Sequence, residues 1–157
     1  MANYGVIDLG SNSVRLVIFD VKDGINKKKP ITCKDFRSII NDKVMAGLSA
    51  YVDAGEFTPE GIARAVDVLS GHLKRARYFN CVRTDIFATA VLRNCTNSRE
   101  AISAIEKAIG SPVNLLSARD EAHLSFTGAS CDRTIEKGTV VDLGGGSTEL
   151  IRVEGGC

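Results

Sequence analysis

One pattern occurs twice in this chain, and the repeat strongly limits the folds that the chain can adopt. VIDLGSNSVRL begins at Val6, and VVDLGGGSTEL begins at Val140. Each copy has an apolar segment, then Asp-Leu-Gly, small residues that end in a serine, and a second apolar segment. Two apolar segments around a short glycine-containing turn predict a β-hairpin. The two copies therefore indicate two related units, each of which begins with this hairpin.

Both turns have the composition of a phosphate-binding loop. Glycine allows the backbone to approach an anion closely and to adopt positive φ angles. Successive N–H groups can then point into one concavity, and hydroxyl and amide side chains add further donors. The candidate phosphate-binding residues in the two turns are Gly10, Ser11, Asn12, Ser13, Gly144, Gly145, Gly146 and Ser147.

An aspartate precedes each turn, Asp8 in the first copy and Asp142 in the second. A carboxylate repels phosphate, so its place beside the loop favours a cation between the two groups. Mg²⁺ takes hard oxygen ligands of this kind. Two such loops that face each other would hold a polyanion across a cleft.

Composition excludes several classes of function. The chain has 157 residues, with 20 basic and 19 acidic side chains and a net charge of +1. This balance gives no general attraction to nucleic acid or to an anionic membrane, and the apolar runs are too short to span a membrane. The five cysteines form no C-x-x-C pair and no signal peptide opens the chain, so we expect reduced thiols in a cytoplasmic protein.

The segments between the repeats predict an α/β fold. Strand patterns cover 4–8, 14–21, 82–90 and 113–116, with a weaker one within 31–41 after a turn at Asp23-Gly24. Helical periodicity covers 58–79 and 97–110, and a third helix begins at Ser117. The order is βββαβαβα, followed by ββ. This order predicts a mixed sheet that is antiparallel at its start and parallel later.

Local signals predict where the helices begin and end. Thr58 is a favourable N-cap, and Ser117 is another, with Asp120 three residues later. Asn97 and Glu100 have the spacing of a capping box. Gly110 is the expected C-cap of the second helix.

Paired hairpins with a βββαβα succession between them resemble the actin, Hsp70 and sugar-kinase superfamily of ribonuclease H-like domains. Four stretches occur in the order of one branch: DLGSNSVRL, ATAVLRNCTN, SARDEAHLSFTG and DLGGGSTEL. Together they are similar to the exopolyphosphatase and guanosine pentaphosphate phosphatase (Ppx/GppA) family, over nearly the whole chain. The resemblance implies Mg²⁺-assisted hydrolysis of the terminal phosphate of polyphosphate or of the 5′ γ-phosphate of guanosine pentaphosphate.

The resemblance also implies roles for individual residues. Glu121 matches the glutamate that activates the attacking water, although a first-turn glutamate also complements the helix dipole. Arg93 matches a phosphate-binding arginine, with a structural ion pair as the alternative. Arg15 matches the family too, but strand alternation is expected to turn it away from the loop.

Three acidic residues match positions around the metal and the water in this family: Asp8, Asp142 and Glu149. The alternative for Glu149 is a solvent-facing strand residue. The chain departs from the family at Ala118, usually glycine, and at Asp120, usually glutamate. The basic segment that often follows the third strand is matched only loosely by DKVMAGLSAYV, which leaves the choice of substrate open.

We expect residues 1–130 to form one actin-like domain, and residues 131–157 to form a connection and the first hairpin of a truncated second domain. That hairpin should pack on its own domain or pair with another copy of the chain as a homodimer. Two other functions stay open: a non-catalytic module that binds polyphosphate or nucleotide, and a kinase-type ATPase.

Overall fold

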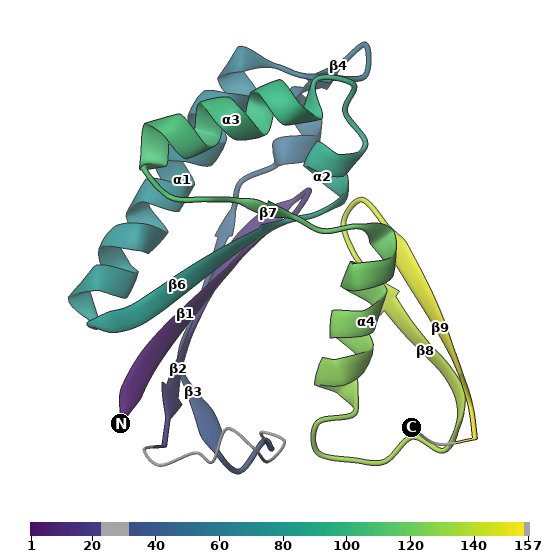
Figure 1. The fold of residues 1–157 in the computed structure, drawn as a ribbon. Coiled ribbons are helices and arrows are strands. Elements are labelled where there is room, and N and C mark those ends of the chain that lie inside the picture. Colours follow the sequence, from purple (N-terminus) through teal and green to yellow (C-terminus); the bar gives the residue numbers. More distant parts are fainter. Residues whose placement is uncertain (23–31, 156–157) are drawn as a thin grey trace.

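The fold is built on a mixed β-sheet. The computed structural model describes residues 1–22 and 32–155, so the turn expected at Asp23-Gly24 lies outside the described residues. Five strands of the described ranges form one sheet in the order β3-β2-β1-β6-β7 (Figure 1). They are β1 (Ala2–Leu9), β2 (Ser13–Val21), β3 (Phe36–Met45), β6 (Cys81–Ala88) and β7 (Asn114–Leu115).

The directions of these strands confirm the predicted α/β architecture. β1, β2 and β3 pair antiparallel, whereas β6 and β7 run parallel to β1. β3 was expected within residues 31–41, but it begins and ends a few residues later. It is an edge strand, and its second half contains polar residues such as Asn41 and Lys43. Polar side chains protect an edge strand from further pairing and weaken the sequence signal of the strand.

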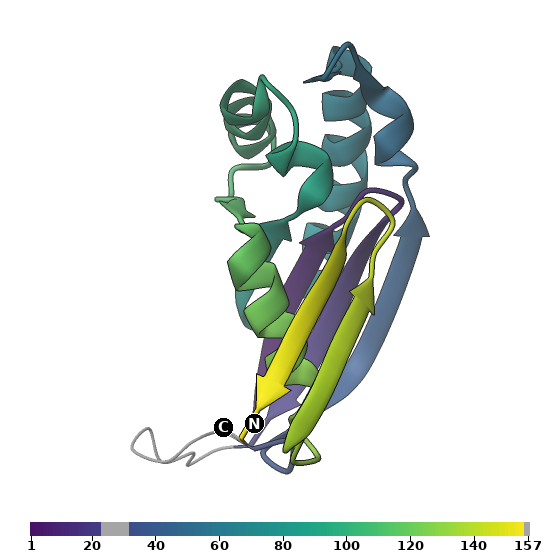
Figure 2. The same cartoon turned by 90° about the vertical axis from the view of Figure 1, so that its right-hand side faces the viewer.

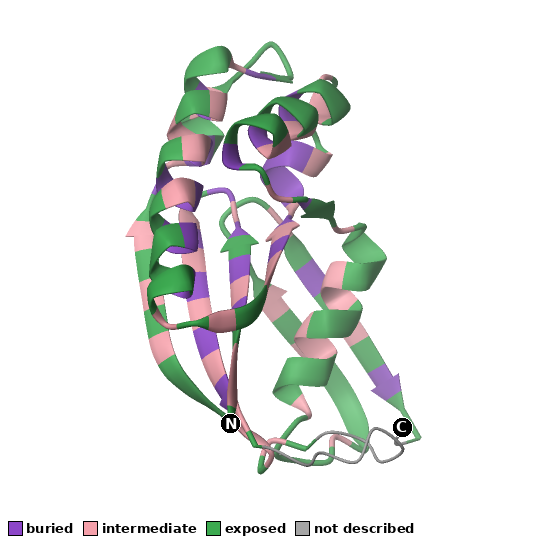
Figure 3. Ribbon diagram, turned by 60° about the vertical axis from the view of Figure 1, so that its left-hand side comes forward, coloured by how far each residue is buried: buried purple, intermediate pink, exposed green. Residues whose placement is uncertain are grey.

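Two long helices cover one face of the sheet. α1 (Pro59–Tyr78) packs against α3 (Ser98–Ile109) and over β1, β2 and β6 (Figure 1). Alternate residues of the central strands point toward these helices, so that Ile7, Leu16 and Ile18 are fully buried (Figure 3). Leu69 of α1 is buried against them in the same core.

All four predicted caps stand at the expected helix ends, but one of them lacks its side-chain bond. The Thr58 side chain accepts a hydrogen bond from the N–H of Gly61, and Gly110 ends α3 with a φ of 67°. The Ser117 side chain caps α4 (Ala118–Ala129) in the same way, by accepting from the N–H of Asp120. The capping box at Asn97 was wrong, because its side chain accepts from the N–H of Phe57 and donates to the Phe57 carbonyl, each at 2.9 Å. The Asn97 side chain is therefore used for a tertiary contact with Phe57, and it does not bond to the end of α3 as its spacing from Glu100 predicted.

Four short elements were not expected from the sequence. They are η1 (Leu48–Tyr51), β4 (Val52–Asp53), β5 (Glu56–Phe57) and α2 (Ala90–Arg93). Each is shorter than the window over which hydrophobic periodicity can be recognised.

A smaller unit lies beside the main sheet. It consists of α4 (Ala118–Ala129) and the hairpin of β8 (Lys137–Leu143) and β9 (Thr148–Glu154), as Figures 1 and 2 show. α4 packs on the hairpin, which is the first of the two expected arrangements; a homodimer stays a prediction. The predicted boundary at residue 130 separates α4 from this hairpin, and the division into domains also stays a prediction. No helix within residues 1–22 and 32–155 is long and apolar enough to cross a membrane.

Candidate functional site

The two repeated sequences form two matching turns. β1 pairs antiparallel with β2, and β8 pairs antiparallel with β9, which confirms both predicted hairpins. In the first turn the N–H of Gly10 donates to the carbonyl of Ser13 at 3.1 Å. In the second turn the N–H of Gly144 donates to the carbonyl of Ser147 at 3.0 Å. The repeat in sequence is therefore a repeat in backbone hydrogen bonding.

The two turns lie against each other at the same end of their hairpins (Figures 1 and 2). A methyl group on Gly146 would lie 2.1 Å from the Ser11 hydroxyl oxygen, and one on Gly145 would lie 2.9 Å from the Asn12 amide nitrogen. The residues with positive φ in the described ranges do not include the glycines of either turn. Gly145 and Gly146 are therefore required because the turns approach so closely, and not because of a positive φ.

The first turn is held from behind by the segment that follows β3. The carbonyl of Asn12 accepts from the N–H groups of Ala46 and Gly47, both at 2.9 Å, and the carbonyl of Ser11 accepts from the N–H of Ser49 at 2.8 Å. In a trans peptide the carbonyl and the following N–H point in opposite directions. The N–H groups of Asn12 and Ser13 therefore point away from this segment.

A cavity of about 330 Å³ lies where the turns meet. Its lining includes the residues of both turns, four carboxylates and two basic side chains. The carboxylates are Asp8, Glu121, Asp142 and Glu149, and the basic side chains are Arg15 and Lys43. The structure thus brings together every candidate site residue except Arg93.

Strand register explains how the basic side chains reach this cavity. Asp8 of β1 is opposite Arg15 of β2, and Arg15 is opposite Lys43 of β3. Residues directly opposite one another on neighbouring strands point to the same face of the sheet. The expectation that Arg15 turns away from the loop was therefore wrong. Lys43 was missed, because its place in this row depends on the pairing of a weakly signalled strand.

The pKa of Asp8 reflects its place among the carboxylates of the cavity. The pKa of Asp8 is raised above its ordinary value by desolvation and by the negative charges of Glu121 and Asp142, against the opposing effect of Arg15. Asp8 is exposed to solvent because it lines the cavity. The protein groups that form the cavity nevertheless desolvate its carboxyl. Glu149 is only 7% exposed and lies opposite Asp142 in the hairpin, so it is not a solvent-facing strand residue.

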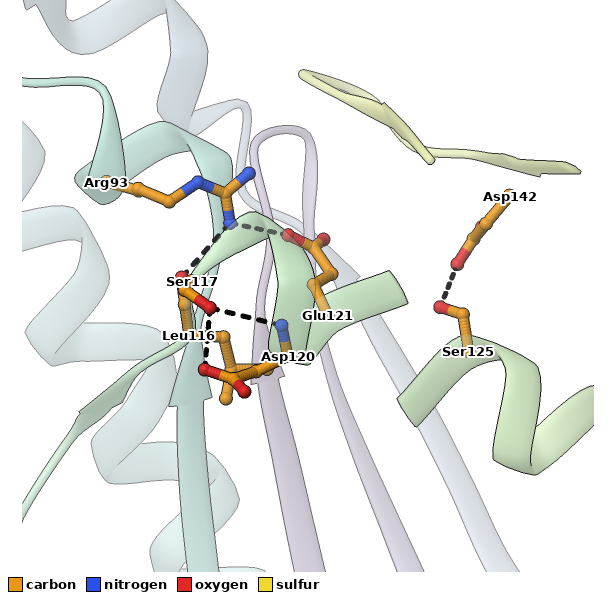
Figure 4. A network of polar contacts seen from close by, with 7 residues as sticks. All are labelled: Arg93, Leu116, Ser117, Asp120, Glu121, Ser125 and Asp142. Atoms are coloured by element: carbon orange, nitrogen blue, oxygen red, sulfur yellow. Dashed lines mark hydrogen bonds and ion pairs between the residues drawn. The ribbon is translucent and has the colours of Figure 1, made fainter. Parts of the chain in front are cut away.

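Arg93 is not among the residues that line the cavity, but it forms an ion pair with Glu121, which does. Its Nη1 donates to Oε2 of Glu121 at 2.6 Å and to the carbonyl of Leu116 at 3.1 Å (Figure 4). Both partners of this ion pair are largely buried, which makes its geometry better defined than that of a surface pair. The ion-pair alternative for Arg93 is thus present, and a contact with phosphate stays a prediction.

α4 connects Glu121 with the second hairpin. The Ser117 side chain accepts from the N–H of Asp120 at 3.1 Å, which confirms the predicted N-cap. Ser125 lies one turn after Glu121 on the same side of the helix, and its hydroxyl donates to Asp142 (Figure 4). Local sequence patterns do not predict this contact, because a serine within a helix is usually solvent-exposed.

The carboxylates could supply oxygen ligands to a cation, but protein side chains alone do not complete a metal site. No cluster of three or more acidic, histidine or cysteine side chains within the described residues is arranged to hold a metal ion. Mg²⁺ commonly takes one or two carboxylates and completes its shell with water and substrate phosphate. Asp8, Asp142 and Glu149 all line the cavity, and one or two of them would suffice for this limited role.

Fold and site together define a protein of the actin-like class, in which two glycine turns meet at a cavity lined by carboxylates. The chain belongs to the Ppx/GppA phosphatase family, whose model matches residues 6–156. It is 31% identical to exopolyphosphatase 2 of Mycobacterium tuberculosis over 96% of this chain and 48% of that protein. It is also 31% identical to a guanosine-5'-triphosphate,3'-diphosphate pyrophosphatase of Vibrio cholerae, over 97% of this chain and 29% of that protein.

Solved structures agree with this assignment. A crystal structure of an exopolyphosphatase from Cytophaga hutchinsonii matches 97% of this chain and 46% of that chain, with a TM-score of 0.82 and 26% identity. A Ppx/GppA family member from Aquifex aeolicus matches with a TM-score of 0.77 and 25% identity, over 98% of this chain and 48% of that chain. The chain thus spans about half the length of these structures and of the mycobacterial relative.

Proposed function

We propose that this chain supplies the catalytic half of a phosphohydrolase that removes the terminal phosphate of a phosphoanhydride chain. The observation that carries the proposal is the cavity in which two matched turns face four carboxylates and two basic side chains. Positioning and charge neutralisation account for most of the catalysis of phosphoryl transfer, and these residues provide both. The substrate is inorganic polyphosphate or guanosine pentaphosphate, because both present a terminal phosphoanhydride.

In this mechanism the turns hold the terminal phosphate. The N–H groups of Asn12 and Ser13 and the hydroxyls of Ser11 and Ser147 donate to its oxygens. Arg15 and Lys43 offset its negative charge from the floor of the cavity. Fixed donors of this kind stabilise charge that develops in the transition state without reorganisation.

Glu121 accepts the proton of the attacking water as general base. It lines the cavity, and its ion pair with Arg93 sets the direction of its carboxylate. One or two of Asp8, Asp142 and Glu149 would hold Mg²⁺, which supplies positive charge beside the phosphate when it is bound. Ser125 orients Asp142 through its hydroxyl.

The proposed enzyme works in the cytoplasm and needs no nucleic acid or membrane. Support for this location comes from the four cysteines within the described residues, all of which are free thiols. Disulfides are rare where glutathione keeps thiols reduced.

Calorimetry and phosphate release test the proposal together. The chain is titrated with polyphosphate and with guanosine pentaphosphate, with and without Mg²⁺, and released phosphate is measured in the same samples. Glu121→Gln should leave binding nearly unchanged and abolish release. Glu100→Gln, which changes a first-turn glutamate of α3 outside the cavity, is the matched control. Binding without any turnover by the unaltered chain would instead support a non-catalytic binding module.

A further inference from the structure

Two cysteines that are far apart in sequence meet at the end of the molecule opposite the glycine turns. Cys33 precedes β3, and Cys131 follows α4. The start of β3 and the end of α4 both lie away from the two turns in Figures 1 and 2. The Cys33 thiol donates to the carbonyl of Cys131 at 3.2 Å, across 98 positions of sequence.

The Cys33 side chain also affects the Cys131 thiol. The pKa of Cys131 is raised above its ordinary value, first by desolvation and then by its interaction with Cys33. Cys131 is exposed and Cys33 is partly exposed, so a small reagent can reach the pair. Cys95, by contrast, is buried, and its thiol donates to the carbonyl of Val91 at 3.0 Å.

We propose that Cys33 and Cys131 form a reversible disulfide that links the edge of the five-stranded sheet to the segment between α4 and β8. The two units already touch at the opposite end, where the glycine turns meet. A covalent bond at the Cys33 end adds a second fixed point and restricts the rotation of one unit against the other. The link closes a long loop, and closing long loops removes much of the freedom of the unfolded chain.

The oxidant is a low-molecular-weight disulfide such as oxidised glutathione. The thiolate of one cysteine attacks a sulfur of the reagent, which forms a mixed disulfide and releases one glutathione. The thiolate of the other cysteine then attacks the protein sulfur of that mixed disulfide, which forms the protein disulfide and releases the second glutathione. Two protein thiols are oxidised, the reagent is reduced to two thiols, and the protons lost by the cysteines remain with the released glutathione. A transient bond of this kind agrees with a cytoplasmic protein.

Mass spectrometry tests the proposal. The fully reduced chain is exposed to mixtures of reduced and oxidised glutathione, quenched with acid and measured intact, and then mapped as peptides without reduction. The expected result is the loss of two hydrogen atoms and one linked peptide pair that contains Cys33 and Cys131, both reversed by dithiothreitol. Cys131→Ser and Cys33→Ser should abolish the pair, whereas Cys81→Ser, which changes another partly exposed cysteine, should keep it.

A second measurement separates the bond from its effect on stability. Oxidation should move the urea midpoint of the unaltered chain and of Cys81→Ser upward, and should leave that of Cys131→Ser in place. Under reducing conditions all these variants should unfold at similar urea concentrations, because Cys33 and Cys131 lie at the surface. A stable glutathione adduct without a linked pair, or linkage to any other cysteine, would overturn the proposal.

Discussion

Gly146 faces Ser11 so closely that a methyl group on Gly146 would lie 2.1 Å from the serine hydroxyl oxygen. The close approach joins two segments from opposite ends of the chain and forms one wall of the cavity. The glycines of the second turn therefore have a packing role that their resemblance to a phosphate loop did not reveal.

Gly146→Ala should push the two turns apart. Overpacking of a tight contact typically costs about 1–3 kcal/mol, and the displaced turn should also weaken phosphate binding. Urea denaturation and calorimetry with polyphosphate measure the two effects. Gly128→Ala, in α4 with open space around it, should instead be neutral or more stable, by up to about 1 kcal/mol. Adding Ser11→Gly to Gly146→Ala should restore part of the stability; no recovery would argue against the Ser11 contact as the cause.

Arg93→Gln should reduce turnover more than substrate binding. The change removes the ion pair to Glu121 and the bond to the Leu116 carbonyl, so Glu121 loses its fixed direction. Misplacement of a catalytic group by about 1 Å can reduce the rate about 100-fold. Steady-state kinetics should therefore show a lower kcat with a nearly unchanged KM. A large rise in KM with kcat preserved would indicate that Arg93 binds phosphate directly.

Asp8→Asn should stabilise the protein at neutral pH when a chelator is present. Because the pKa of Asp8 is raised in the folded state, the folded chain binds this proton more tightly than the unfolded chain does. The favourable contribution is complete below the ordinary pKa of an aspartate, and it is lost as pH rises through the raised value. Thermal unfolding at a series of pH values should show an advantage of Asp8→Asn at neutral pH that disappears in acid. An equal advantage at every pH would contradict the electrostatic explanation.

Asn97→Ala should destabilise the protein by about 1–3 kcal/mol, because two hydrogen bonds to Phe57 are lost. Asn97→Asp distinguishes the two roles of this residue. An aspartate is a good N-cap, but it cannot donate to the Phe57 carbonyl and would repel it. We expect Asn97→Asp to lower the urea midpoint. An unchanged midpoint would instead indicate that this residue stabilises the protein as the N-cap of α3.

The sequence predicted those features that depend on neighbouring residues. Both hairpins, the Thr58 and Ser117 caps and the left-handed Gly110 follow from local spacing, and the structure has them. The missed features depend on contacts between distant segments. Lys43 reaches the cavity through the register of three strands, and Ser125 reaches Asp142 through the packing of α4 on the hairpin. Neither contact leaves a periodic signal in the sequence.

The position of α4 has a mechanical consequence for the site. None of its twelve residues, all within the described range, is fully buried. Even so, the helix is joined to the hairpin through Ser125 and to the main sheet through the Arg93–Glu121 pair. If the smaller unit shifts as one body, Glu121 and Asp142 travel together and keep their spacing. The separation that changes is the one between this travelling pair and Asp8, which is fixed in β1.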